Sequence, residues 1–135
     1  MAKINKIAIL TSGGDAPGMN AAIRAVVRSG LSHGLEVYAV YDGYAGLVEG
    51  NIQKMDRSSV TNIINRGGTV LYTARSQEFM TLEGQQKAAS TCKFLGLDSI
   101  IAIGGDGTFR GASALSKFGI NVVCIPATID NDICC

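Results

Sequence analysis

The chain has little proline, little charge and almost no excess of either sign. Only 2 of its 135 residues are proline, charged residues make up 17%, and the formal net charge is +1. A nearly neutral chain argues against a nucleic-acid or membrane surface as its function. Apolar residues make up 47%, which argues against disorder. The length predicts one domain with a real core.

Metal-binding cysteine pairs and long hydrophobic runs are also missing. The cysteines stand at Cys92, Cys124, Cys134 and Cys135, and their spacing fits neither a zinc site nor a disulfide framework. We interpret them as reduced thiols of a cytoplasmic protein. The first apolar run stops at Thr11 and is too short for a signal peptide or a membrane span.

Glycine, in contrast, is plentiful, and it gathers where predicted strands end. The chain has 17 glycines. Apolar runs predict strands at residues 7–10, 35–41, 69–72, 99–103 and 121–125. Helical patterns begin near Met19, near Val60, at Leu82 and after Gly107, the last reaching about Lys117. This alternation predicts an α/β fold with an open, mostly parallel sheet and helices on both faces, and a ligand at the carboxyl ends of the strands.

Two Gly-Gly-Asp loops follow such strands, at residues 13–15 and 104–106. Glycine lets backbone N–H groups approach a phosphate, and the helix that follows adds its positive end. Asp106 would repel a phosphate unless a cation lies between them, so Mg²⁺ is the expected partner. The alternative is a tight strand-to-helix turn with Asp106 as the N-cap.

An acidic stretch, residues 128–132, follows the last predicted strand. In an extended segment Asp130 and Asp132 lie on the same side, about 7 Å apart. One carboxylate can accept a hydroxyl proton while the other lies near a metal. A polar turn at Asn131 is the alternative, but two glycine loops at the same edge favour phosphoryl transfer.

Four further side chains have less specific patterns. Arg24 and Arg28 are four residues apart on a predicted helix, where like charges repel unless an anion joins them; a solvated helix face is the alternative. Arg75 follows a predicted strand and could reach a phosphoryl group, or lie in an exposed loop. Tyr44 could stack on an adenine, although a packed loop aromatic is commoner.

Several long motifs, in unbroken order from Lys6 to Ile133, resemble the bacterial ATP-dependent 6-phosphofructokinases. They lie at residues 10–24, 41–44, 64–68, 103–107 and 126–132. The resemblance implies a phosphofructokinase-like, Rossmann-type three-layer fold. It also implies transfer of the ATP γ-phosphoryl group to the 1-hydroxyl of fructose 6-phosphate with Mg²⁺, the committed step of glycolysis.

The resemblance also implies roles for individual residues. Asp130 is the expected general base, with Thr128 and Asp132 beside it, and Gly14 and Arg75 lie near the transferred group. The expected substrate contacts are Thr128, Ile129 and Asp130, and the expected metal-side residues are Asp106 and Asp132. The expected ATP contacts are Gly14, Tyr44, Arg75, Ser76, Gly105, Asp106, Gly107 and Thr108. The expected effector residues, for ADP or phosphoenolpyruvate between subunits of a homotetramer, are Arg24, Arg28 and Arg57.

Other positions bear on the choice of phosphoryl donor and on the extent of the lobe. Gly107 favours ATP, because the pyrophosphate-dependent relatives carry an aspartate there. Met80, Asn62 and Ala127 depart from the family pattern. We expect residues 1–133 to form the N-terminal ATP-binding lobe and residues 134–135 to be an atypical end. The rest of the family subunit is then absent, productive sugar binding is impaired, and exposed sheet edges reduce solubility.

Two other functions remain open at this point. The first is a non-catalytic ATP-binding fragment or regulator, which would bind ATP without transferring its phosphoryl group. The second, ranked last, is another kinase that shares the loop at residues 104–107.

Overall fold

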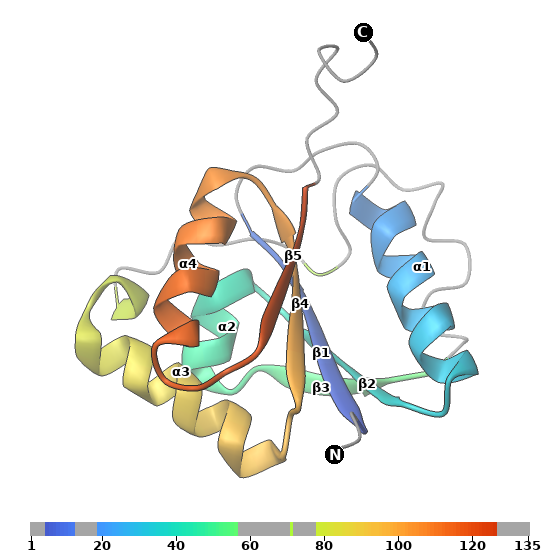
Figure 1. Ribbon diagram of the computed structural model, residues 1–135, viewed down its shortest axis with the longest axis horizontal. Helices are drawn as coiled ribbons and strands as arrows, with labels where there is room; N and C mark the ends of the chain where they lie inside the picture. The colour runs from blue at the N-terminus through green and yellow to red at the C-terminus, as the bar shows by residue number, and fades with distance from the viewer. Residues whose placement is uncertain (1–4, 13–18, 57–70, 72–77, 127–135) are drawn as a thin grey trace, which may run out of the picture.

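The computed structural model describes residues 5–12, 19–56, 71 and 78–126, and within them the chain forms one five-stranded sheet (Figure 1). The spatial order of the strands is β3-β2-β1-β4-β5. Their bounds are β1 Lys6–Thr11, β2 Glu36–Val40, β3 Ile52–Met55, β4 Ser99–Gly104 and β5 Val122–Pro126. All neighbouring pairs are parallel except β2 with β3. The open, mostly parallel sheet predicted from the sequence is confirmed.

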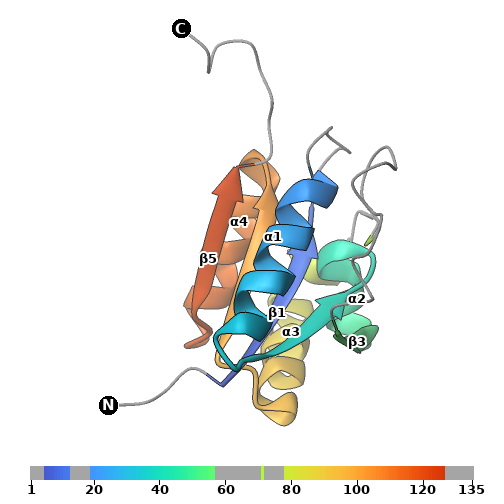
Figure 2. The same cartoon turned by 90° about the vertical axis from the view of Figure 1, so that its right-hand side faces the viewer.

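Helices cover both faces of this sheet. The helix α1 (Met19–Ser32) packs on one face, and α2 (Gly43–Glu49), α3 (Leu82–Leu95) and α4 (Asp106–Ser116) pack on the other (Figure 2). A single 3₁₀ turn, η3 (Glu78–Met80), leads into α3. The arrangement has three layers, as expected for parallel strands joined by helical crossovers. No helix in the described part of the chain is both long and apolar enough to cross a membrane.

The strand β1 shows why both faces need cover. Successive side chains of a strand point to opposite faces. Ala8 and Leu10 accordingly join the core under α2, α3 and α4, whereas Ile7 and Ile9 join the core under α1. A continuous apolar run is therefore what this central strand requires, because neither of its faces meets water.

The ends of α3 are set by local chemistry that the sequence displays. Thr81 is the N-cap, and its hydroxyl oxygen accepts a hydrogen bond from the backbone N–H of Gly84 at 3.0 Å. Gly96 ends the helix in the left-handed region at φ 72°, where glycine carries no Cβ penalty. The predicted helix at residues 82–95 is confirmed.

The sequence analysis missed the helix α2, the antiparallel edge strand β3 and the 3₁₀ turn η3. The chain turns into α2 through Asp42 and Gly43, both with positive φ (65° and 61°). A Cβ at Gly46 would overlap the carbonyl of Tyr41, so the helix folds back tightly on the strand it follows. Because the chain turns within a few residues, this stretch has no long hydrophobic periodicity from which a helix or strand could be predicted.

Some predicted elements lie outside the described residues. The helix expected near residues 60–64 is one. Of the strand expected at residues 69–72 only Leu71 is described; it is fully buried, it lies in a turn, and its carbonyl accepts the N–H of Asp42 at 2.9 Å.

Candidate functional site

The carboxyl ends of β1 and β4 lie directly beside each other. Thr11 pairs with Ile103 in the parallel register, and the N–H of Ser12 continues the ladder to the carbonyl of Ile103 at 2.9 Å. Because a Gly-Gly-Asp sequence begins at each of these two ends, both loops start from neighbouring points of one sheet edge. The two starting points are adjacent because β1 and β4 are neighbours in the sheet.

Gly104 allows the two strand ends to approach closely. A Cβ at this position would overlap the side-chain oxygen of Thr108 and the carbonyl oxygen of Ser12. The hydroxyl of Thr108, a fully buried residue, donates to the Ser12 carbonyl at 3.3 Å. Gly104 is therefore needed for a contact between backbones, and the side chain of Thr108 faces the protein interior.

Residues 105–108, which we call the α4 turn, begin the helix at the end of β4. Gly105 is the N-cap, and its carbonyl accepts the N–H groups of Thr108 at 3.0 Å and Phe109 at 3.3 Å. Asp106 is the first helical residue, so the alternative that made it the N-cap is wrong. A Cβ at Gly105 would meet no atom of the described residues within 4 Å, so none of these residues fills the space beside the positive end of α4.

Tyr44 packs into the core beside this turn. Its side chain is 6% exposed, and its ring stacks on Phe79 with centroids 4.5 Å apart. Its hydroxyl donates to the carbonyl of Thr108 at 2.8 Å. Burial is the main cause that raises the pKa of Tyr44, so the hydroxyl remains a donor at neutral pH. The geometry favours the packed-aromatic alternative for this residue.

The acidic stretch follows the next strand of the sheet. In the parallel register Pro126, the last residue of β5, pairs with Gly104, so the chain leaves β5 at the same edge as the glycine loops. The residues predicted there, Thr128, Ile129, Asp130 and Asp132, lie outside the described part of the chain, as do Gly14, Arg57, Arg75 and Ser76.

Magnesium suits the chemistry of the residues predicted for it. Hard divalent cations prefer carboxylate oxygens, and Asp106 stands at the start of α4 beside Gly105. Among the described residues no group of three or more histidine, cysteine, aspartate or glutamate side chains lies together. A metal site here would therefore need Asp132 or the phosphate oxygens of a ligand in addition to Asp106.

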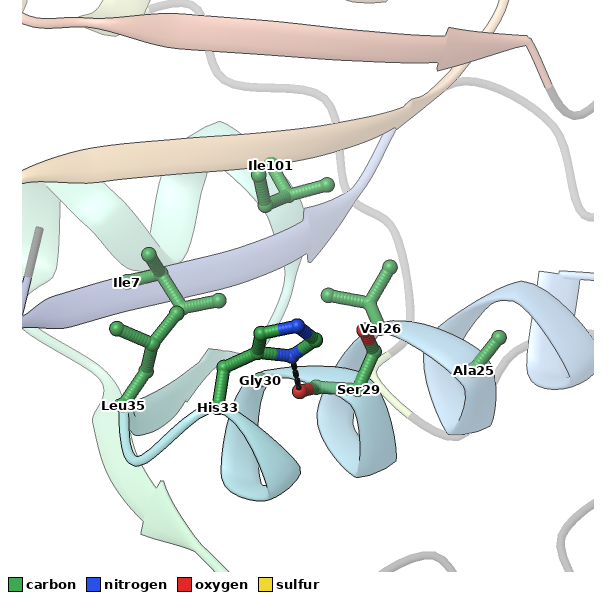
Figure 3. A pocket seen from close by; sticks show the side chains of 8 residues that line it. All are labelled: Ile7, Ala25, Val26, Ser29, Gly30, His33, Leu35 and Ile101. Atoms are coloured by element: carbon green, nitrogen blue, oxygen red, sulfur yellow. Dashed lines mark hydrogen bonds between the residues drawn. The ribbon is translucent and has the colours of Figure 1, made fainter.

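The arginine pair predicted for an anion lies on α1. Arg24 is half-buried and Arg28 is exposed, one helical turn apart. The same helix borders an open, largely apolar cavity of about 310 Å³ against Ile7 and Ile101 of the sheet (Figure 3). His33 lines it and hydrogen-bonds through Nδ1 to the Ser29 carbonyl at 2.8 Å. This cavity lies where α1 ends and β1 begins, and none of the predicted site residues lines it.

Sequence comparison assigns the chain to a known family. The family model described as Phosphofructokinase matches residues 6–135, which is nearly the whole chain. The chain belongs to the phosphofructokinase family. Its membership confirms the resemblance inferred from the motifs.

Curated members of the family are closely similar in sequence. The chain is 58% identical over 130 residues to the ATP-dependent 6-phosphofructokinase of Halalkalibacterium halodurans, covering 96% of this chain and 41% of the relative. It is 61% identical over 130 residues to the enzyme of the same name from Paenibacillus macquariensis, covering 96% of this chain and 40% of the relative. The chain thus spans about 40% of the length of these relatives.

Solved family structures share the fold. The chain superposes on phosphofructokinase from Saccharomyces cerevisiae with a TM-score of 0.85 and 38% identity, covering 95% of this chain and 20% of that one. It superposes on Pichia pastoris phosphofructokinase in the T-state with a TM-score of 0.89 and 38% identity, covering 98% and 16%. These matches confirm the phosphofructokinase-like fold.

Sequence reasoning missed the internal support of the site. Phe79 carries no motif signal, and Gly104 was interpreted as a ligand-loop glycine, although it serves close packing against Ser12. The contact with Ser12 joins residues more than 90 positions apart and follows from the pairing of β1 with β4, whereas the stack of Phe79 on Tyr44 joins η3 to α2.

Proposed function

We propose that this chain contributes the ATP-binding part of a 6-phosphofructokinase. The reaction is transfer of the ATP γ-phosphoryl group to the 1-hydroxyl of fructose 6-phosphate, giving fructose 1,6-bisphosphate. The support is family membership and the names of its relatives. The single observation that carries the proposal is the adjacency of β1 and β4, which starts two Gly-Gly-Asp loops at one sheet edge.

The backbone supplies the binding chemistry in this proposal. N–H groups of the α4 turn and of the loop after β1 hold phosphate oxygens, and the positive end of α4 offsets part of their charge. Phosphoryl transfer asks mainly for positioning and charge stabilisation, so a rigid edge that presents donors suits it. Mg²⁺, when bound, would neutralise phosphate charge, with Asp106 and Asp132 as its proposed protein ligands.

The residues that complete the reaction belong to the proposal as well. Asp130 accepts the proton of the sugar hydroxyl, with Thr128 and Ile129 beside the substrate. Gly14, Arg75 and Ser76 lie at the ATP phosphates, where an arginine can stabilise the transferred group. A homotetramer with ADP or phosphoenolpyruvate bound near Arg24, Arg28 and Arg57, and a cytoplasmic location, complete the proposal.

Calorimetry with Mg-ATP tests the binding step on the 135-residue chain. We expect saturable binding of Mg-ATP, because Gly107 leaves room for the α-phosphate. We expect much weaker binding of Mg-pyrophosphate. A chain that folds but binds no Mg-ATP would contradict the proposal.

A coupled assay for fructose 1,6-bisphosphate on the same sample tests the transfer step. Asp130→Asn should abolish any transfer that the unmodified chain shows and leave Mg-ATP affinity unchanged, because the base acts on the sugar hydroxyl and not on the nucleotide. Binding of Mg-ATP without any transfer by the unmodified chain would support the non-catalytic alternative, for which the comparisons provide no support.

A further inference from the structure

We infer that Tyr44 is a positioning residue that fixes the α4 turn through the backbone carbonyl of Thr108. The importance of this turn for nucleotide binding rests on the proposed function. The hydrogen bond itself, 2.8 Å long and buried, links α2 to the first turn of α4 across 64 positions in the sequence.

The ring of Tyr44 is held from two sides. It stacks on Phe79 of η3 with an interplanar angle of 10°. It also lies against Gly111 of α4, where an added Cβ would overlap ring atoms. Since close-packed rings have little freedom to shift, the hydroxyl is directed at one acceptor.

Thr108 is the point at which three segments of the chain meet. Its carbonyl accepts the Tyr44 hydroxyl, its own hydroxyl donates to Ser12 at 3.3 Å, and its N–H donates to Gly105 at 3.0 Å. The start of α2, the end of β1 and the α4 turn are therefore joined through one fully buried residue.

These bonds bear on function because the α4 turn carries the donors proposed for phosphate. Binding is stronger when donors are already in place, since less ordering is required on association. The Tyr44 hydroxyl does not need to touch the ligand to have this effect. It acts by keeping the turn in its helical conformation, in which Gly105 is the N-cap and α4 begins at Asp106.

Tyr44→Phe tests the inference because it removes one oxygen and keeps the ring. Amide hydrogen exchange is measured residue by residue without nucleotide. A buried hydrogen bond contributes about 1 kcal/mol, which corresponds to about a fivefold change in a local equilibrium. We expect the N–H groups of Thr108 and Phe109 to exchange about fivefold faster, while those of Ile9 and Ala39 in the sheet stay unchanged.

Tyr38→Phe is the matched control. Its hydroxyl also makes one hydrogen bond, to the Glu36 carboxylate at 3.0 Å, but both residues of that bond belong to β2 and neither belongs to α4. This variant should leave the exchange of Thr108 and Phe109 unchanged. If Tyr44→Phe accelerates sheet and turn amides by the same factor, or leaves the turn unchanged, the inference is wrong.

Mg-ATP affinity provides the functional readout. We expect Tyr44→Phe to weaken it about fivefold and Tyr38→Phe to leave it unchanged. A loosened turn with unaltered affinity would overturn the positioning role. If the unmodified chain binds no Mg-ATP, the proposed function fails, whereas the exchange comparison still decides whether Tyr44 holds the turn.

Thr108→Val changes the other partner of the Tyr44–Thr108 contact. It gives a second test of the inference in case Tyr44→Phe does not fold. It removes the bond to Ser12 and keeps the side-chain volume nearly unchanged. We expect faster exchange at the N–H of Ser12 as well as at Phe109. If the N–H of Ser12 exchanges at the same rate as in the unmodified chain, Thr108 does not hold the end of β1.

Discussion

Replacement of Gly104 by alanine tests the close approach on which the site geometry depends. Its neighbour Gly105 provides the control, because the two glycines are adjacent and differ in their surroundings. A Cβ at Gly104 would overlap the Thr108 hydroxyl and the Ser12 carbonyl, whereas one at Gly105 would meet no atom of the part of the chain that the structure describes within 4 Å.

The expected cost at Gly104 has two contributions. Forcing an extra carbon against well-packed atoms costs typically 1–3 kcal/mol, and one of the obstacles here is backbone, which cannot rotate away as a side chain can. Loss of the Thr108–Ser12 hydrogen bond adds about 1 kcal/mol. The free energy of unfolding should therefore fall by about 2–4 kcal/mol, and the midpoint of thermal unfolding by roughly 10 °C for a chain of this size.

Circular dichroism during heating measures the midpoint for both variants. Gly105→Ala should unfold within about 2 °C of the unmodified chain, since its φ of −109° is negative and an added Cβ would meet no atom of the described residues within 4 Å. Under the proposed function the same variant should lose Mg-ATP affinity, because its methyl group stands where a phosphate would approach the turn. If Gly104→Ala is as stable as Gly105→Ala, the described contact between β1 and α4 is wrong.

Three further predictions concern the rest of the described fold. Two backbone N–H groups near the amino terminus donate to the Asp98 carboxylate at 2.7 and 2.8 Å and lower its pKa. The stabilising effect of Asp98 is therefore present above the unfolded pKa of about 3.9 and is lost as the pH falls through the folded pKa. Urea midpoints measured from pH 2 to 7 should vary less in Asp98→Asn than in the unmodified chain. Burial raises the pKa of Cys92 to about 12, so alkylation at pH 8 followed by peptide mapping should leave it unmodified in the folded chain and modified in urea. Leu47→Ala in α2 should lower the free energy of unfolding by about 2–5 kcal/mol, measured by chemical unfolding, because the side chain is fully buried. Leu82→Ala, at a side chain that is 65% exposed, should lower it by less than about 0.5 kcal/mol. Equal losses in the two variants would refute the placement of α2.

Long regular elements could be predicted because their signals are local. The helix α3 carries its cap, its period and its terminal glycine within a short stretch, so its bounds agree with the prediction. The helix α2 and the strand β3 could not be predicted, because Asp42 and Gly43 turn the chain through positive φ and the elements are only seven and four residues long. Antiparallel pairing of β3 with β2 depends on that turn and has no motif.

For the residues near the site, too, some features could be predicted from the sequence and others could not. Glycine and aspartate after apolar strands predicted a phosphate-binding edge, since those residue types suit phosphates and cations wherever they occur. The inward orientation of Thr108 and the packing of Tyr44 were not predictable. Both depend on contacts with residues 64 or more positions away, and nothing in their immediate neighbours reveals which face of the chain they occupy.

The sequence by itself determined the family, the strand-and-helix alternation and the residue types available for phosphate chemistry, because each of these is written in short, contiguous patterns. Only the tertiary structure decided that β1 and β4 are neighbours, that Gly104 serves a backbone contact, and that Thr108 joins α2 to both strand ends. The physical reason is that close packing and buried hydrogen bonds arise between distant segments, whose pairing follows from the whole set of buried surfaces and from no single stretch of chain.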